Sequence, residues 1–131
     1  MNNFASQGAL GNYHSTRAQT AVESADPHKL IDMLMERALA RIAIAKGHMQ
    51  RGETAEKGEH IGGAVAIVDG LRACLDHDSG GELSTNLENL YEYMSRRLVE
   101  ANLSNDVPIL DEVSGLVREI RGAWTAIAEH A

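Results

Sequence analysis

The residues with the clearest capacity for metal binding or proton transfer are the histidines. They stand at His14, His28, His48, His60, His77 and His130. No two of them are four residues apart, the spacing that points two imidazoles from one helix face at a metal ion. The run Asp76-His77-Asp78 has three metal-binding side chains in succession, but neighbouring residues point in different directions at a helix end. We therefore interpret the histidines as solvated or capping side chains and predict no metal site.

The single cysteine, Cys74, is the candidate nucleophile, but nothing nearby would stabilise its thiolate. Arg72 projects in another direction, so a packed and inert thiol is expected. The pair Gly62-Gly63 does not belong to a phosphate-binding fingerprint, because no strand precedes it. Carboxylates are frequent, but none lies in an apolar stripe where burial would raise its pKa. The sequence therefore predicts neither catalysis nor a cofactor.

The totals indicate one soluble domain over residues 1–131, with residues 1–12 flexible. A chain of this length can bury one continuous core. Its net charge of -7 would repel a phosphate backbone, so no nucleic acid partner is expected. The single cysteine fits a reducing compartment, and the first residues lack the pattern of a secretory signal. Since no apolar run approaches the ~18 residues of a membrane helix, we expect a cytoplasmic protein without membrane insertion.

Four amphipathic segments must position any functional side chain. Asp26 before Pro27 and Asp106 before Pro108 mark two helix starts, because the first turn of a helix does not need the N–H that proline lacks. Glycine-containing turns mark the two remaining breaks. The predicted helices span Pro27–Gln50, Ala55–Asp76, Glu82–Leu103 and Val107–Glu129.

Each segment carries an apolar stripe with the period of an α-helix. The expected core residues are Leu30, Ile31, Leu34, Met35, Ala38, Ile42, Ala45 and Met49, then Ile61, Ala64, Val68, Leu71 and Leu75, then Leu83, Leu87, Leu90, Met94, Leu98 and Ala101, and finally Ile109, Val113, Leu116, Ile120, Trp124 and Ile127. Similar lengths and short links favour antiparallel neighbours. The sequence predicts an all-α fold, an antiparallel four-helix bundle with an additional short N-terminal helix or arm.

Some apolar, aromatic and amide side chains lie outside these stripes. Met33 and Ile44 share a flank of the first segment, and Asn86, Tyr93 and Arg97 form a mixed stripe beside the core face of the third. Such groups suit contacts with a partner helix, in which aromatic and arginine anchors dominate. A solvated flank of long side chains has the same composition, so the pattern alone leaves both interpretations open.

Several motifs occur in a fixed order between about residues 13 and 127. They are Ala25-Asp26-Pro27-His28-Lys29-Leu30-Ile31, Met33-Leu34, Lys57-Gly58-Glu59 with Ile61, Gly80-Gly81-Glu82, Asn86-Leu87, Leu90-Tyr91-Glu92-Tyr93-Met94, Ala101-Asn102-Leu103, Asn105-Asp106, Glu112-Val113, Ile120-Arg121 and Ala123-Trp124. In order and spacing, the chain resembles the FliS family of flagellar export chaperones. It departs at Met35-Glu36-Arg37, where the family commonly has an aromatic residue, an acidic residue and a glycine. Arg37 could close a channel that binds a helix of the exported client protein, or it could pair with a carboxylate on that client.

The resemblance implies a cytoplasmic helical bundle that binds the disordered C-terminal region of flagellin. It implies that the bundle prevents premature polymerisation of flagellin and delivers it to the flagellar type III export apparatus, with other flagellar regulators as further partners and a monomer or weak homodimer as the free state. Tyr13 matches a tyrosine in the family's N-terminal arm, near the flagellin groove. The expected flagellin contacts are Tyr13, Met33, Ile44, Lys57, Ile61, Val65, Asn86, Tyr93 and Arg97.

Two other functions are rival hypotheses. The chain could be a helical-bundle adaptor or regulator that binds a different amphipathic client. It could also be a small metal-dependent bundle enzyme, which needs inward Glu-x-x-His pairs on facing helices. No such pair lies in an apolar stripe, so the enzyme ranks far below the two binding proteins.

Overall fold

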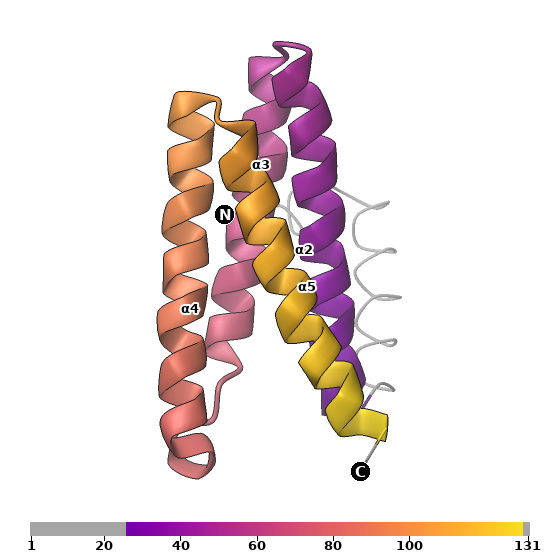
Figure 1. Ribbon diagram of the computed structural model, residues 1–131, viewed down its shortest axis with the longest axis vertical. Helices are drawn as coiled ribbons and strands as arrows, with labels where there is room; N and C mark the ends of the chain where they lie inside the picture. Colours follow the sequence, from indigo (N-terminus) through magenta and orange to yellow (C-terminus); the bar gives the residue numbers. More distant parts are fainter. Residues whose placement is uncertain (1–25, 130–131) are drawn as a thin grey trace, which may run out of the picture. The chain divides into compact units, whose positions relative to one another are not determined.

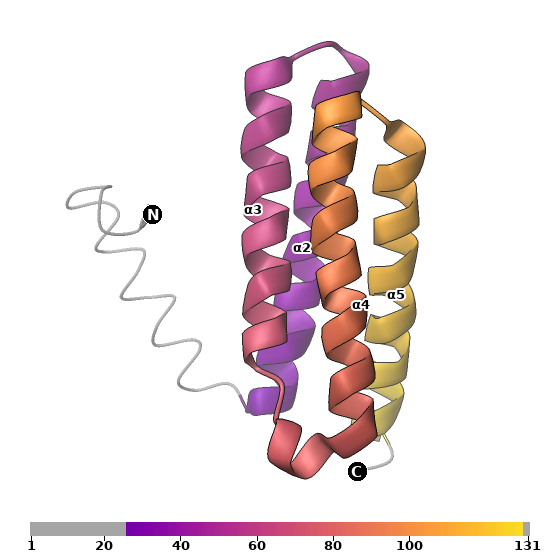
Figure 2. The ribbon, with the colours of Figure 1, turned by 90° about the vertical axis from the view of Figure 1, so that its left-hand side faces the viewer.

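The computed structural model describes residues 26–129, and these residues form four α-helices (Figures 1 and 2). The helices are α2 (Pro27–Gln50), α3 (Thr54–Ala73), α4 (His77–Ser104) and α5 (Val107–Glu129). No β-strand occurs between residues 26 and 129, so the predicted all-α class is confirmed. The expected N-terminal helix or arm, which includes Tyr13, lies outside the described residues.

The chain divides into two units, residues 1–31 and residues 32–131. The described part of the first unit is the beginning of α2. There Asp26 Oδ1 accepts a hydrogen bond from the backbone N–H of Lys29 at 2.8 Å, and Pro27 takes the first helical position. This carboxylate pairs one of the N–H groups that the first turn leaves free. The helix therefore begins at the residue that the sequence predicts.

The turn between α4 and α5 ends one helix and begins the next within two residues. Asn105 adopts a left-handed conformation, with φ 54°, and ends α4. Asp106 Oδ1 then accepts a hydrogen bond from the backbone N–H of Ile109 at 3.4 Å, which caps α5. The predicted start of α5 at Val107 is confirmed.

Helix α3 ends at Ala73, three residues before its predicted end. Asp76 belongs to the next helix instead, because its Oδ1 accepts hydrogen bonds from the backbone N–H groups of Asp78 and Ser79, each at 3.1 Å. Cys74 lies at the C-terminus of α3 with its thiol exposed, so the expectation of a packed thiol is wrong. The physical reason is that the helix ends before Cys74 can join its apolar flank.

Helix α4 begins at His77 and is broken at Gly81, where φ is 54° and ψ is -128°. The sequence predicts a chain reversal at this glycine, but the structure has a kink between a short first turn and the main helix. Leu83, two residues after the kink, is 62% exposed and is not the core residue that periodicity predicts. Ser84 is buried in its place, and its hydroxyl donates to Asp76 O at 2.8 Å.

We expect Gly81→Ala to destabilise the protein by about 1–2 kcal/mol. A side chain at this combination of φ and ψ meets its own backbone, so alanine would be strained even though the space around the glycine is open. Urea denaturation followed by circular dichroism measures the change. Gly62→Ala is the control, because Gly62 lies inside α3 with open space around it, and alanine favours a helix. A Gly81→Ala protein as stable as the wild type would contradict the strain argument.

The core of residues 32–131 takes one apolar stripe from each helix. Its buried apolar residues are Met35, Ala38, Ile42, Ala45, Met49, Ile61, Ala64, Val68, Leu71, Tyr91, Met94, Leu98, Ala101, Ile109, Leu110, Val113 and Val117. Each fully buried large side chain contributes about 1.5–3 kcal/mol through removal of apolar surface from water. Ile127, predicted to be core, is 53% exposed in the last turns of α5. None of the helices within residues 26–129 is long and apolar enough to span a bilayer.

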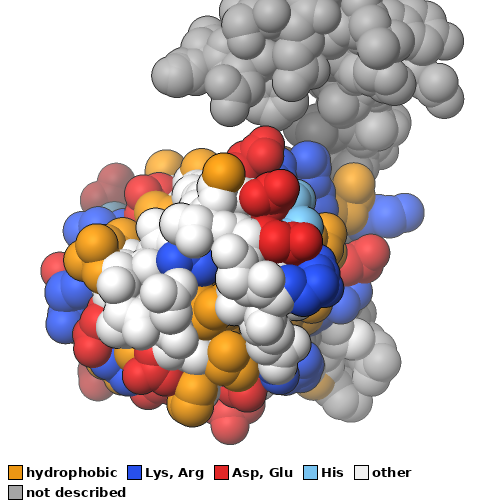
Figure 3. All heavy atoms as spheres, turned by 90° about the horizontal axis from the view of Figure 1, so that it is seen from above, with side chains coloured by type: hydrophobic (Ala, Val, Ile, Leu, Met, Phe, Trp, Pro, Cys, Tyr) orange, Lys and Arg blue, Asp and Glu red, His pale blue; other side chains and the backbone are white. Residues whose placement is uncertain are grey.

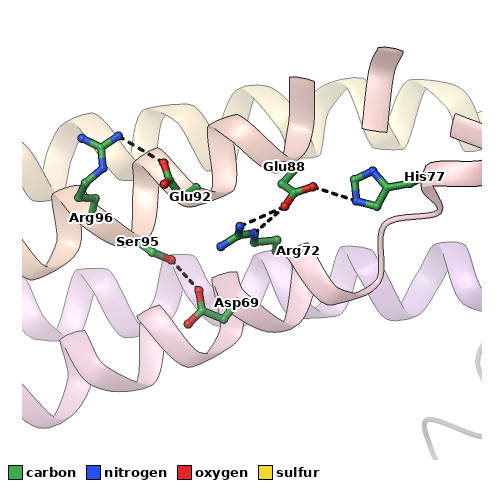
Figure 4. Close-up of polar contacts among 7 residues, drawn as sticks. All are labelled: Asp69, Arg72, His77, Glu88, Glu92, Ser95 and Arg96. Atoms are coloured by element: carbon green, nitrogen blue, oxygen red, sulfur yellow. Dashed lines mark hydrogen bonds and ion pairs between the residues drawn. The ribbon is translucent and has the colours of Figure 1, made fainter. Parts of the chain in front are cut away.

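Helices α3 and α4 lie side by side and run in opposite directions (Figure 2). The hydroxyl of Ser95 donates to Asp69 Oδ1 at 2.9 Å, and Arg72 Nη2 donates to Glu88 Oε2 at 3.0 Å. Residue numbers therefore rise along α3 as they fall along α4. Figure 4 shows these two contacts bridging the same pair of helices.

Candidate partner-binding surface

The structure distributes the expected contact residues over three helices. The described ones are Met33 and Ile44 on α2, Lys57, Ile61 and Val65 on α3, and Asn86, Tyr93 and Arg97 on α4. Tyr13 lies outside the described residues. Asn86 is exposed, whereas Met33, Val65, Tyr93 and Arg97 are half-buried. A flagellin contact at any of these positions stays a prediction.

Tyr93 and Arg97 meet a single carboxylate of α5. The hydroxyl of Tyr93 donates to Glu112 Oε2 at 2.7 Å, and Arg97 Nε donates to Glu112 Oε1 at 2.9 Å. Arg97 also donates to Glu100 Oε1 at 2.8 Å, and the guanidinium of Arg96 lies 5.5 Å from the centre of the Tyr93 ring. The hydrogen bond from Tyr93 is the main cause of a lowered Glu112 pKa, and the same bond raises the pKa of Tyr93. These side chains therefore join α4 to α5 through polar contacts.

The lowered pKa of Glu112 predicts a loss of stability in acid. A carboxylate with a folded-state pKa below its ordinary value of 4.5 stabilises the fold above that value, and the contribution disappears as the pH falls through the folded pKa. We expect Glu112→Gln to be less stable than the wild type at pH 7 and to lose less stability between about pH 5 and 3. Chemical denaturation at several pH values measures how the free energy of unfolding of each protein depends on pH. Parallel pH profiles for the two proteins would contradict this role of Glu112.

Lys57 and Ile61 lie inside the fold rather than on its surface. Lys57 is 4% exposed, and its Nζ donates to Asn102 O at 2.9 Å and to Asn105 Oδ1 at 2.6 Å. The ammonium thus pairs acceptors at the C-terminus of α4, where the helix dipole favours a positive charge. Ile61 is 2% exposed and belongs to the core. The geometry gives both residues a structural role. The sequence contained a signal for it, because Lys57 lies one turn before Ile61 on the core stripe.

Arg41 and His60 form a contact between α2 and α3 that the sequence did not identify. Arg41 Nη1 lies 3.1 Å from His60 Nδ1. The guanidinium crosses α3 at Gly63, where a Cβ atom would lie only 2.8 Å from Arg41 Cζ. The signal for this contact in the sequence was Gly63, a helical glycine that belongs to no phosphate-binding motif. A glycine at such a position allows a side chain from another helix to approach closely.

A second polar group surrounds the turn between α2 and α3. His48 Nδ1 is hydrogen-bonded to Glu53 Oε1 at 2.7 Å, and Arg51 Nε donates to the same oxygen at 2.8 Å. The hydrogen bond with His48, followed by that with Arg51, lowers the pKa of Glu53. The rings of His48 and His60 stack with centroids 5.4 Å apart. Figure 3, which views this end of the helices, shows histidine, acidic and basic side chains gathered at one edge.

The charged side chains at the α3–α4 junction pair with one another (Figure 4). Glu88 accepts from Arg72 at 3.0 Å and forms an ion pair with His77 Nε2, also at 3.0 Å. A depression of about 470 Å³ lies beside them, lined by Asp69, Arg72, Ala73, Leu75, His77 and Glu88. Between residues 26 and 129, no three histidine, cysteine or carboxylate side chains stand together as metal ligands would. The charges at this junction therefore serve to hold α3 and α4 together.

An arginine of α5 holds the opposite side of α2. Arg121 Nε donates to Asp32 Oδ1 at 2.7 Å, and Arg121 Nη2 donates to Glu36 Oε2 at 3.1 Å. Further along, Lys46 Nζ donates to Asp111 Oδ1 at 2.8 Å. The hydrogen bond with Asp32 is the main cause that raises the pKa of Arg121. Both acidic residues of α2 thus face α5, and the other flank of α2 keeps only basic charges.

Comparison with known proteins decides the family. The family described as flagellar protein FliS matches residues 9–131. The chain belongs to the FliS family. It is similar to the flagellar secretion chaperone FliSB of Pseudomonas aeruginosa, with 48% identity over 120 residues that cover 92% of this chain and 95% of the relative. It is also similar to the flagellar secretion chaperones FliS of Salmonella typhimurium, with 43% identity covering 91% and 89%, and of Bacillus subtilis, with 34% identity covering 88% and 86%.

Membership of the FliS family confirms the resemblance that the ordered motifs indicate. FliS proteins are chaperones and not enzymes, so the prediction that this chain does not catalyse a reaction is confirmed. The names of the FliS relatives support a role in flagellar export. The side chains of the FliS fold described above are accordingly candidates for binding and for stability.

Proposed function

We propose that this protein binds the disordered C-terminal region of flagellin in the cytoplasm, prevents its premature polymerisation and delivers it to the flagellar type III export apparatus. The observation that carries the proposal is the family match over residues 9–131, together with relatives named flagellar secretion chaperones. The export apparatus and other flagellar regulators are then the further partners. The free protein is a monomer or a weak homodimer.

The architecture that serves this function is an antiparallel four-helix bundle with an N-terminal arm that carries Tyr13. A disordered client loses conformational entropy when it folds onto such a bundle, and burial of its apolar faces offsets that cost. The bundle offers apolar side chains for this purpose, since Ile44, Val99 and Leu103 are 46%, 49% and 80% exposed. Covering the client in this way keeps its assembly surfaces from meeting those of other flagellin molecules.

Isothermal titration calorimetry with a peptide spanning the C-terminal segment of the cognate flagellin tests the proposal. We expect saturable binding with a negative heat-capacity change, because apolar surface is buried as the peptide folds. A scrambled peptide of the same composition is the control. A correctly folded protein that binds the flagellin peptide no better than the scrambled one would contradict the proposal and favour an adaptor for a different client.

A further inference from the structure

The guanidinium of Arg41 is held in place by two neighbours that carry no negative charge. Gly63 leaves room for it on α3, and His60 Nδ1 contacts its Nη1 at 3.1 Å. His60 offers a lone pair rather than a carboxylate, so the charge of Arg41 is positioned without being neutralised. The Nε and Nη2 edges have no hydrogen-bond partner among the described residues. A planar guanidinium fixed in this way is suited to bidentate binding of a carboxylate.

The charge of this region contrasts with that of the whole chain, which carries -7. Most described arginines form an ion pair with a carboxylate of the chain, namely Arg51, Arg72, Arg96, Arg97 and Arg121. Arg37 is exposed, and neither it nor Arg41 has a carboxylate partner within residues 26–129. Two unneutralised cations one helical turn apart therefore lie on α2, with Arg37 exposed and Arg41 half-buried against α3.

Apolar side chains flank the two arginines on the same side of the helix. Met33 precedes Arg37 by four residues, and Ile44 follows Arg41 by three, which places all of them on one face of α2. Ile44 is 46% exposed, and Met33 is half-buried. We call these four residues the α2 outer face. At 1.5 Å per residue, the face is about 16 Å long, enough for roughly three turns of a partner helix.

We propose that the α2 outer face binds an amphipathic segment of the client that carries carboxylates one turn apart, with Arg37 and Arg41 pairing the carboxylates and Met33 and Ile44 covering the apolar side. The inference rests on the proposed function, because it names the chemistry of the client segment. The argument for this occupant is charge complementarity. Both carboxylates of α2 itself face α5, so carboxylates on the partner would supply the negative charge that the α2 outer face lacks. Apolar contacts would exclude water from the resulting ion pairs.

Gly63→Ala separates this role from a contribution to the fold. Alanine at position 63 is favoured in a helix, but its Cβ would displace the tip of Arg41, which is flexible enough to move. We therefore expect a melting temperature equal to or above that of the wild type. We expect the flagellin C-terminal peptide to bind about fivefold more weakly, because Arg41 must be repositioned before it can pair. Unchanged affinity would overturn the assigned role of Gly63 in holding Arg41.

Arg37→Ala and Arg41→Ala test the carboxylate pairing itself. Each should weaken the flagellin peptide about tenfold and reduce the salt dependence of binding. Arg118→Ala is the matched control, because this exposed α5 arginine also has no carboxylate partner within residues 26–129, and it should change affinity less than twofold. A peptide whose Asp and Glu residues are replaced by Asn and Gln should bind the wild type weakly and the two variants with similar affinity.

The outcomes distinguish this inference from the proposed function. Wild-type binding that is insensitive to Arg37, Arg41 and the peptide carboxylates would overturn the inference and leave the chaperone function standing. Absence of any binding by the folded wild type would overturn both. Loss of affinity in the two variants, with the control unchanged, would support the α2 outer face as the site that selects acidic client segments.

Discussion

Ile61→Ala should lower the free energy of unfolding by about 2–5 kcal/mol. Ile61 is 2% exposed and lies on the core stripe of α3, so truncation removes buried methyl groups and leaves a cavity that neighbouring helices fill only in part. Urea denaturation followed by circular dichroism measures this loss. The slope of the free energy of unfolding against urea concentration should stay the same, since the extent of the folded core does not change.

The control for Ile61 is Tyr93→Ala, because both residues were expected to contact flagellin. Tyr93 is half-buried on α4 and hydrogen-bonded to the exposed residue Glu112, so its truncation should cost much less stability than that of Ile61. Flagellin affinity, measured below the melting transition, should fall for a true contact residue and hold for a core residue. A stable Ile61→Ala protein with weakened flagellin binding would show that Ile61 serves the client rather than the core.

Lys57→Met should destabilise the protein by about 2–3 kcal/mol. Methionine fills much of the same space but cannot donate to Asn102 O or Asn105 Oδ1, and both acceptors would then face an apolar side chain. The loss is larger than for a surface lysine because Lys57 is 4% exposed and its hydrogen bonds are charge-assisted. The C-terminal turn of α4 should also exchange its amide hydrogens faster.

Arg96→Met is the comparison for Lys57→Met, since Arg96 pairs with Glu92 at the surface and is largely exposed. Exposed pairs of this kind contribute little, so we expect a change within about 0.5 kcal/mol. If Lys57→Met were as stable as Arg96→Met, the buried ammonium would have no structural role. Its predicted part in flagellin binding would then be the better interpretation.

The starts of α2 and α5 and the end of α4 were predictable from the sequence because their signals are local. Pro27 and the Asp26 cap act within one turn, as do Asp106 and the backbone of Asn105 at the other junction. A carboxylate or a left-handed residue at such a position determines where a helix begins or ends without reference to the rest of the chain. Apolar periodicity then identified most of the core for the same reason.

The α3–α4 junction was predicted less well because two opposing local signals overlap there. Asp76 looks like the end of an amphipathic helix, but its carboxylate caps the following one. Gly81 then breaks α4 near its start, and beside this break Leu83 is exposed while Ser84 is buried and donates to Asp76 O. Farther along α4, Met94, Leu98 and Ala101 are buried as periodicity predicts, so the break affects only the first turns of the helix.

The candidate binding surface was harder to predict because it depends on contacts between residues far apart in the chain. Tyr93 and Arg97 were predicted from their types, but their partner Glu112 lies 15 to 19 residues away on another helix. The role of Arg41 likewise depends on His60, 19 residues away. Spacing within one helix reveals which side chains share a face, whereas the charge that remains free on that face follows only from the packing of the neighbouring helices.

The contact of Arg121 with Asp32 joins residues 89 positions apart. A ribosome that adds roughly 5–20 residues per second needs about 4–18 s to synthesise that stretch. The α3–α4 contacts, which span 16 to 26 residues, can form within a few seconds of synthesis. During translation, the side of α2 that α5 later covers therefore stays open longest, and the newly made chain becomes a finished chaperone only after its last helix has left the ribosome.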